Sequence, residues 1–241
     1  MDEQQRQEKQ RVKEERRLSF DVQRKACRLR ELPAAAIFDG ILEQAVPLSA
    51  VNEETGHENH AEMLYVMAIA AVRRPARIFE FGTFLGRTTL HLARACPEAS
   101  VTTLDLPQAE NPWAYGPYVG SYFANAPEAS RIRQIRESSF TFDPAPLARS
   151  MDLVWVDADH SYDGVKNDTI KAFELLAPGG VIMWHDFGPD SLDLVRYIRE
   201  LTKVRPLFRL RKTSVLLHID GVDPLDFEPR PIPFTKALFK K

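Results

Sequence analysis

The sequence has few cysteines, no long apolar run and little net charge, and each shortage excludes a class of protein. Cys27 and Cys96 are too few for a disulfide framework or a cysteine-based zinc site. The N-terminus lacks the apolar segment of a signal peptide, and the longest weakly polar stretch, residues 61–72, is too short to span a bilayer. A formal net charge of −2 gives no basic field that would attract nucleic acid. We therefore expect a cytoplasmic, globular protein that binds neither membranes nor nucleic acid.

The two ends of the chain differ in composition from the rest. Residues 1–31 contain ten Lys or Arg and seven Asp or Glu, with no proline or glycine, which favours a solvated helix. Prolines and a Lys-Lys pair mark residues 222–241. We expect a charged helical extension over residues 1–50 and a proline-rich tail over residues 222–241, on either side of one domain over residues 51–221.

From residue 77 onward, short apolar strands alternate with helices. Strands that are apolar on successive residues are typical of a parallel sheet covered on both faces, and the alternation predicts a doubly wound α/β sheet. The last two strands are close enough in sequence to form an antiparallel hairpin. Expected strands are 77–82, 101–105, 132–135, 152–157, 181–184, 207–211 and 214–219, and expected helices are 37–46, 57–74, 88–95, 162–176 and 191–203.

Ligands of open α/β sheets bind at the carboxyl ends of the strands. The first strand ends in a turn with Gly82 and Gly86, and the helix after it offers free N–H groups to an anion. The turn has neither the G-x-G-x-x-G spacing nor the lysine of a phosphate-binding loop, and Glu80 would repel a pyrophosphate. Asp105 ends the second strand, where an acid accepts hydrogen bonds from ribose hydroxyls. A ribose, a carboxylate and a cationic group without phosphate describe S-adenosylmethionine (SAM).

Ionisable residues also follow the later strands. Asp157, Asp159 and His160 come after the fourth strand, and His185 and Asp186 come after the fifth. Such groups at strand ends are costly unless they bind something, although Asp159 also suits a helix N-cap.

These segments resemble the SAM-dependent methyltransferases of class I, and in particular the methyltransferase domain 24 family. Glu80 to Gly86 resembles the first family motif, and the segments 156–165 and 176–186 resemble the motifs after the fourth and fifth strands. The resemblance covers about residues 55–220. It implies a Rossmann-like sheet of seven mostly parallel strands with a C-terminal antiparallel hairpin. The cofactor-binding residues implied by the motifs and their spacing are Glu80, Gly82, Thr83, Gly86, Asp105, Ser138, Ser139 and Asp157.

The sequence departs from the family pattern at two points. A Gly-Asp-Ser-like run after the third strand is replaced by Glu137-Ser138-Ser139, so Ser138 or Ser139 would recognise adenine. A Gly-Thr-Ser turn near the end is replaced by residues 212–214, Lys-Thr-Ser.

The resemblance implies O-methylation of a small-molecule or glycosyl hydroxyl by in-line methyl transfer. Two devices would free the hydroxyl lone pair. Asp159, His160 or His185 could act as a general base, or Asp157 and Asp186 could hold Mg²⁺. Metal-dependent relatives carry acidic ligands at these places, and His185 stands where a third ligand is typical.

The segment 111–129 is long and rich in aromatic residues, and we expect it to cover the acceptor or to pack against a neighbouring subunit. A homodimer would form through this loop, the N-terminal helix or the tail. Glu62 is expected near the methionine end of the cofactor. The alternatives are a methyltransferase-like scaffold without catalysis, a nicotinamide-dependent dehydrogenase, and a nucleic-acid N-methyltransferase, whose Asn/Asp-Pro-Pro-Tyr motif is absent.

Overall fold

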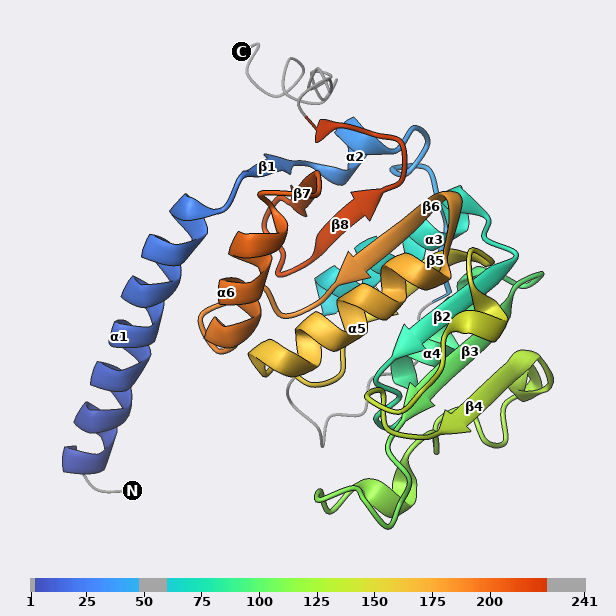
Figure 1. Cartoon of the computed structure of the whole chain (residues 1–241), viewed down its shortest axis with the longest axis horizontal. Coiled ribbons are helices and arrows are strands. Elements are labelled where there is room, and N and C mark those ends of the chain that lie inside the picture. The colour runs from blue at the N-terminus through green and yellow to red at the C-terminus, as the bar shows by residue number, and fades with distance from the viewer. Residues whose placement is uncertain (1–2, 48–59, 225–241) are drawn as a thin grey trace, which may run out of the picture.

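The computed structural model describes residues 3–47 and 60–224, so the expected proline-rich tail lies almost entirely outside the described residues. An eight-stranded sheet forms the centre of the molecule, in the order β1-β7-β8-β6-β5-β2-β3-β4 (Figure 1). Only β8 runs antiparallel to its neighbours. The strands are β1 (Leu29–Leu32), β2 (Arg77–Phe81), β3 (Ser100–Asp105), β4 (Ile132–Arg136), β5 (Met151–Val156), β6 (Leu176–Trp184), β7 (Leu207–Leu210) and β8 (Leu216–Ile219).

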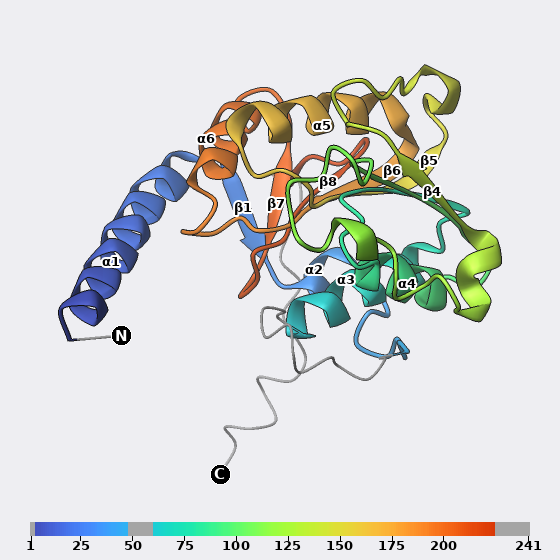
Figure 2. The ribbon, with the colours of Figure 1, turned by 90° about the horizontal axis from the view of Figure 1, so that it is seen from below.

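Helices cover both faces of this sheet, as the continuous apolar strands predict (Figure 2). Successive residues of a strand enter opposite cores: Ile78 packs in the core beneath α3 and α4, and Phe79 packs in the core beneath α5 and α6. The Rossmann-like architecture and the antiparallel β7–β8 hairpin are therefore confirmed. The helices are α1 (Glu3–Ala26), α2 (Ala34–Ile37), α3 (His60–Arg73), α4 (Arg87–Ala95), α5 (Tyr162–Leu175) and α6 (Leu192–Leu201).

The eighth strand comes from the N-terminal extension. β1 pairs in parallel with β7 from Leu29–Leu207 to Leu32–Leu210, and adds an edge to the seven strands expected. Sequence reasoning missed it because the strand has only four residues and follows directly on a charged helix. The helix expected over residues 37–46 is also wrong. Only α2 is helical there, and residues 39–43 form turns in which Gly40 has a φ of 76°.

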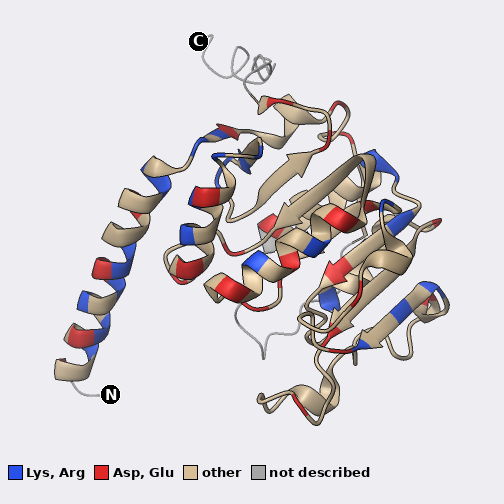
Figure 3. Ribbon diagram, in the orientation of Figure 1, with Lys and Arg blue, Asp and Glu red and all other residues tan. Residues whose placement is uncertain are grey.

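The N-terminal helix α1 extends away from the sheet and carries charges of both signs along its length (Figures 1 and 3). Its one buried side chain among the described residues, Phe20, meets the ring of Phe187 at 5.5 Å between centroids. No helix in the part of the chain that the structure describes is both long and apolar enough to cross a bilayer.

Candidate active site

The turn after β2 depends on two glycines that no other residue can replace without movement. Gly82 has a φ of 92°, and a Cβ built on it would lie 2.1 Å from the carbonyl oxygen of Asp157. Gly86 has a φ of 85°, and its Cβ would lie 2.5 Å from the ring of Phe123. Both positions need a left-handed backbone and a close approach, which only glycine provides cheaply. The first glycine brings the ends of β2 and β5 together, and the second starts α4.

Asp105 fastens this turn to the end of β3. Its Oδ2 accepts hydrogen bonds from the backbone N–H groups of Thr83 (3.0 Å) and Phe84 (2.8 Å), and its Oδ1 accepts one from Leu106 (2.7 Å). Asp105 also lines a cavity above the strand ends. A carboxylate has about four acceptor sites, so three bonds leave one for a ligand. The sequence placed Asp105 at a ribose, but did not foresee that it holds the turn in shape.

Glu80 lies beneath the turn. Its side chain is buried, and Oε2 accepts hydrogen bonds from the hydroxyls of Thr89 and Thr103, the latter at 2.6 Å. The Thr103 hydroxyl is also 2.7 Å from that of Thr83. Burial raises the pKa of Glu80 to about 8 despite these bonds. Glu80 is not among the residues that line the cavity described below, so its expected direct contact with a cationic group stays a prediction. Its buried Oε1 has no hydrogen-bond partner among the described residues.

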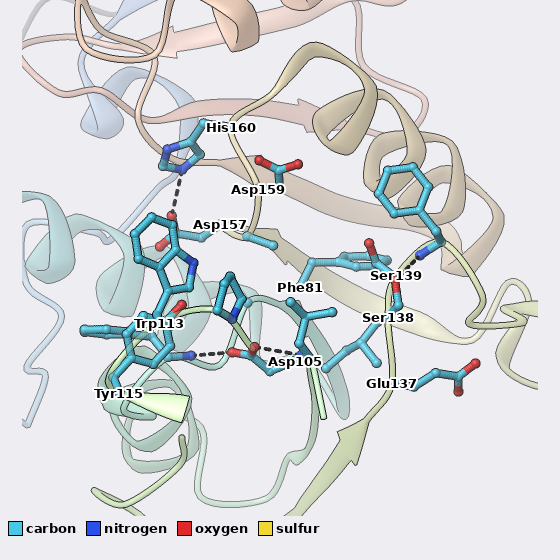
Figure 4. A pocket seen from close by; sticks show the side chains of 17 residues that line it. Phe81, Asp105, Trp113, Tyr115, Glu137, Ser138, Ser139, Asp157, Asp159 and His160 are labelled. Carbon is cyan, nitrogen blue, oxygen red and sulfur yellow. Dashed lines mark hydrogen bonds and ion pairs between the residues drawn. The ribbon is translucent and has the colours of Figure 1, made fainter. Parts of the chain in front are cut away.

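A cavity of about 580 Å³ opens at the carboxyl ends of β2, β3 and β5 (Figure 4). Trp113 and Tyr115 lie toward one side of it, and Ser138 and Ser139 lie toward the other (Figure 4). Among its 17 lining residues are four carboxylates and no lysine or arginine. The lining comprises Phe81, Gly82, Phe84, Leu104, Asp105, Leu106, Pro112, Trp113, Tyr115, Glu137, Ser138, Ser139, Phe140, Asp157, Ala158, Asp159 and His160.

The segment of Ser138 and Ser139 is held from α5. Lys171 donates hydrogen bonds to the backbone carbonyls of Ser139, Phe140 (3.2 Å) and Phe142 (2.7 Å). Asn167 donates to the carbonyl (3.0 Å) and hydroxyl (3.3 Å) of Ser139. Both serines lie where adenine recognition was expected, but the hydroxyl of Ser139 already has a partner. Sequence reasoning missed Lys171 and Asn167 because they stand some 30 residues away on a helix.

The aromatic segment, residues 111–129, lines part of the cavity and also packs against the glycine turn. Trp113 and Tyr115 line the cavity, whereas Phe123 is buried against Gly86. The N–H groups of Gly120 and Tyr122 donate to the carbonyls of Phe84 and Leu85, at 2.8 and 2.9 Å. The part of this segment near Trp113 is therefore available to cover a ligand, while the later part is structural.

Two imidazoles and two carboxylates meet at the rim of the cavity. Nε2 of His160 lies 3.8 Å from Oδ1 of Asp157 and 3.3 Å from Oδ2 of Asp186. Nδ1 of His185 lies 3.3 Å from Oδ1 of Asp157 and 3.4 Å from Oδ1 of Asp186. Asp186 has a φ of 57°, an uncommon backbone conformation for a residue other than glycine. We call Asp157, His160, His185 and Asp186 the rim cluster.

Opposite charges determine how the rim cluster titrates. Burial opposes ionisation of Asp157, but the neighbouring imidazoles of His185 and His160 outweigh it and lower the pKa of Asp157. Burial likewise opposes the charged form of His185, but the carboxylates around it raise its pKa. The hydrogen bond with Asp157 raises the pKa of His160. The cluster is therefore built to hold positive charge between carboxylates.

Glu62 of α3 contacts the ring nitrogen of His185 that faces away from Asp157 and Asp186. It is 6% exposed, and its Oε2 lies 3.1 Å from Nε2 of His185. Ser214 fixes the same carboxylate with its N–H at 2.6 Å and its hydroxyl at 2.7 Å. Sequence reasoning expected Glu62 near the cofactor but did not connect it with His185, which is 123 residues away. In the sequence, the feature nearest to this contact was the departure from the family pattern at residues 212–214, which includes Ser214.

Asp159 lies outside the rim cluster. Its carboxylate accepts hydrogen bonds from the N–H (3.0 Å) and hydroxyl (2.5 Å) of Ser161. Ser161 is the N-cap of α5 and accepts from the N–H of Gly164 at 3.1 Å. The structure thus brings His160, His185, Asp157 and Asp186 together and uses Asp159 to shape the start of a helix, although Asp159 also lines the cavity.

Comparison with known proteins identifies the domain. Residues 79–187 match a family model described as a methyltransferase domain, Methyltransf_24. No curated protein sequence matches the chain. Solved structures share the fold at low identity. The S-adenosylhomocysteine-bound methyltransferase PaMTH1 of Podospora anserina is 16% identical, covers 81% of this chain and 91% of its own, and has a TM-score of 0.56.

Two O-methyltransferases give similar values. The enzyme of Bacillus cereus, in complex with S-adenosylhomocysteine, is 15% identical over 77% of this chain and 97% of its own, with a TM-score of 0.54. TomG of Streptomyces achromogenes, in complex with SAM, is 22% identical over 80% of this chain and 92% of its own, with a TM-score of 0.50. The family match and the shared fold agree with the sequence motifs. Residues 79–187 of this chain therefore match a methyltransferase domain, and the chain shares the Rossmann-like fold of these methyltransferases.

Proposed function

We propose that this chain is a SAM-dependent O-methyltransferase that methylates a hydroxyl group of a small-molecule or glycosyl acceptor. The observation that carries the proposal is the position of the rim cluster. A group of imidazoles and carboxylates lies at the edge of a cavity of about 580 Å³, at the carboxyl ends of the strands where ligands of this fold bind. Methyl transfer to a hydroxyl needs both a cofactor site and a place for the hydroxyl proton.

The cavity suits SAM by charge and by shape. Its four carboxylates, without lysine or arginine, favour a cofactor that carries a sulfonium and disfavour a diphosphate. The missing side chain at Gly82 lets the turn pack against the backbone after β5, which forms one wall of the cavity. We assign the ribose to Asp105, the adenine end to Ser138 and Ser139, and the turn contacts to Gly82, Thr83 and Gly86. Glu80 supports the turn from below, and Asp157 faces both the cavity and the rim cluster.

When bound, SAM supplies an electrophilic methyl group. The chain itself has to align the acceptor with that methyl group, which contributes up to ~7–11 kcal/mol to a well-oriented displacement. Trp113 and Tyr115 provide apolar surface for a ring of the acceptor. His160 and His185 provide the nitrogen atoms that ease removal of the hydroxyl proton, either as proton acceptors or as metal ligands. Asp159 has a weaker claim to that role because Ser161 occupies it.

Mg²⁺, the ion that the family resemblance implies, does not fit this site well. Mg²⁺ prefers six oxygen ligands, several of them water, in a regular octahedron. The rim cluster offers only two carboxylates, and imidazole nitrogens occupy the remaining positions facing the same space. We therefore assign no step of the reaction to Mg²⁺.

Calorimetry with SAM and with S-adenosylhomocysteine tests the cofactor assignment. We expect micromolar binding, and Asp105→Ala should raise the dissociation constant roughly 5- to 150-fold through ~1–3 kcal/mol of lost hydrogen bonding. Asp190→Asn, which removes an exposed carboxylate that does not line the cavity, serves as the control. Release of S-adenosylhomocysteine in the presence of phenols and sugars then tests catalysis.

Two results would contradict the proposal. Tighter binding of NAD than of S-adenosylhomocysteine would favour a dehydrogenase. Cofactor binding without turnover on any hydroxylated acceptor would favour a methyltransferase-like binding protein. The assembly of the protein stays a prediction, in which α1, the aromatic segment or the tail joins two copies.

A further inference from the structure

We infer that the acceptor is a small hydroxylated compound that carries an ammonium group, and that Asp159 and the ring of Trp113 bind this group. The inference rests on the proposed function and names the chemical class of its acceptor. It excludes acceptors that carry phosphate or carboxylate groups. Three observations lead to it: the charge of the cavity wall, an exposed carboxylate without a role in the cofactor site, and exposed aromatic surface beside it.

The wall of the cavity is negatively charged. Among the described residues, Asp105, Glu137, Asp157 and Asp159 line the cavity, whereas the imidazole of His160 is its only basic side chain. The wall therefore stays negative even with His160 protonated. SAM offsets only part of this charge, because its sulfonium and ammonium groups are accompanied by a carboxylate. A phosphate or carboxylate on the acceptor would add repulsion, with no described lysine or arginine in the lining to pair with it.

Three of the four carboxylates are directed elsewhere. Asp105 holds the glycine turn, and Asp157 contacts the imidazoles of the rim cluster. Figure 4 shows the carboxylate of Glu137 directed away from the other three. Asp159 is exposed, and its carboxylate accepts two hydrogen bonds, both from Ser161. A carboxylate has about four acceptor sites, so about two remain at Asp159 for a ligand.

The start of α5 fixes the position of Asp159. The N–H and the hydroxyl of Ser161 both donate to its carboxylate. Gly164 makes room for the same group, because a Cβ built on Gly164 would lie 2.3 Å from Oδ2 of Asp159. Glycine within a helix is destabilising relative to alanine, so this room comes at a cost to the helix. A carboxylate that is already fixed loses less conformational entropy when it binds a cation than a mobile one does.

Aromatic surface lies in the same cavity. Trp113 is 63% exposed and lines the cavity together with Tyr115. The face of an indole ring attracts cations, so an exposed tryptophan and a carboxylate together are complementary to an ammonium group. His160, to which we assign the hydroxyl proton, directly follows Asp159 and also lines the cavity. One small molecule can therefore place its ammonium group at Asp159 and its hydroxyl at His160.

Two series of probe compounds test the inference, and within each series only one group changes. The phenols are tyramine, para-ethylphenol and para-hydroxyphenylpropionate, and the sugars are methyl glucosaminide, methyl glucoside and methyl glucuronide. Binding to the full-length protein, with and without S-adenosylhomocysteine, is measured by calorimetry and by tryptophan fluorescence. Trp113 reports on the site because the other two tryptophans, Trp155 and Trp184, are buried. Release of S-adenosylhomocysteine from SAM measures turnover of each probe.

We expect the ammonium member of at least one series to bind at least about tenfold more tightly than the neutral member, and the carboxylate member to bind most weakly. Added salt should weaken binding of the ammonium member. Asp159→Asn, which keeps an oxygen for Ser161, should reduce the preference for ammonium at least about fivefold. Trp113→Leu should also reduce it, and because this side chain is exposed, the variant still decides if Asp159→Asn does not fold.

Asp163→Asn is the matched control. It removes an exposed carboxylate in the first turn of α5 that does not line the cavity, and should leave the preference unchanged. Circular dichroism checks that each variant folds.

The inference is overturned if the neutral or the carboxylate member binds as tightly as the ammonium member in both series, or if neither ammonium member binds at about 10 mM. It is also overturned if Asp159→Asn and Trp113→Leu both keep the preference of the wild type. Failure of the proposed function has a different signature. Protein that prefers the ammonium probes but does not bind S-adenosylhomocysteine, or binds it without turning over any probe, would support the ammonium site and contradict the methyltransferase.

Discussion

Replacing Gly82 with alanine tests how the candidate site is assembled. The added Cβ would lie 2.1 Å from the carbonyl oxygen and 2.6 Å from the carbonyl carbon of Asp157, and 2.8 Å from Cα of Ala158. All three are backbone atoms at the end of β5, so no side-chain rotation relieves the overlap. Either the turn after β2 or the end of β5 has to move.

Two costs add up at this position. Holding alanine at a φ of 92° costs roughly 1–2 kcal/mol, the usual penalty for a left-handed backbone with a side chain. Forcing the packed backbone apart costs a further ~1–3 kcal/mol. We therefore expect Gly82→Ala to lower the free energy of unfolding by roughly 2–5 kcal/mol.

Gly179→Ala separates the two costs. Gly179 has a φ of 75°, but its Cβ would meet nothing within 4 Å, so this variant bears only the backbone penalty. Urea unfolding of both variants, followed by circular dichroism, gives the comparison. If Gly82→Ala is no more destabilising than Gly179→Ala, then the close approach of the turn to β5 is not a tight contact, and the argument for glycine at that point is wrong.

Two further predictions concern groups around the site. Burial raises the pKa of Glu80 to about 8, so between pH 5 and 8 the folded protein retains a proton that the unfolded chain loses. The free energy of unfolding of the wild type should therefore fall across this range by up to about 1.4 kcal/mol per pH unit relative to Glu80→Gln. The same pH dependence of that free energy in both proteins, measured by urea unfolding, would contradict this. Ser161→Ala removes the N-cap of α5 and should lower the free energy of unfolding by about 1 kcal/mol; a variant as stable as the wild type in urea unfolding would contradict the capping role.

The sheet and its ligand-binding edge were predictable because local signals agreed. Apolar runs such as residues 152–157 have the length of a buried strand, and Gly82 and Gly86 mark the turn after β2. Parallel strands place their carboxyl ends along one edge, so Asp105, Asp157 and His185 had to lie along that edge once the strands were identified. The positions of the strands in the sequence were sufficient to predict this shared edge.

Features that depend on distant contacts were not predictable. β1 is a strand only because β7 offers an unpaired edge, which a four-residue segment does not reveal. Glu62 meets His185 and Ser214 only after α3 folds against the turn that precedes β8. The sequence suggested that Asp159 is a catalytic group or a helix N-cap. The N-cap of α5 is in fact Ser161, which donates two hydrogen bonds to Asp159, and a catalytic role for Asp159 stays a prediction.

Asp157 joins the cofactor turn and the rim cluster physically. Its carbonyl group meets Gly82, its N–H donates to the carbonyl of Phe81, and its carboxylate contacts both imidazoles of the cluster. A shift of the turn therefore moves the same residue that contacts the two imidazoles proposed to handle the hydroxyl proton. We therefore expect Gly82→Ala to lose affinity for S-adenosylhomocysteine as well as stability, whereas Gly179→Ala should lose only stability.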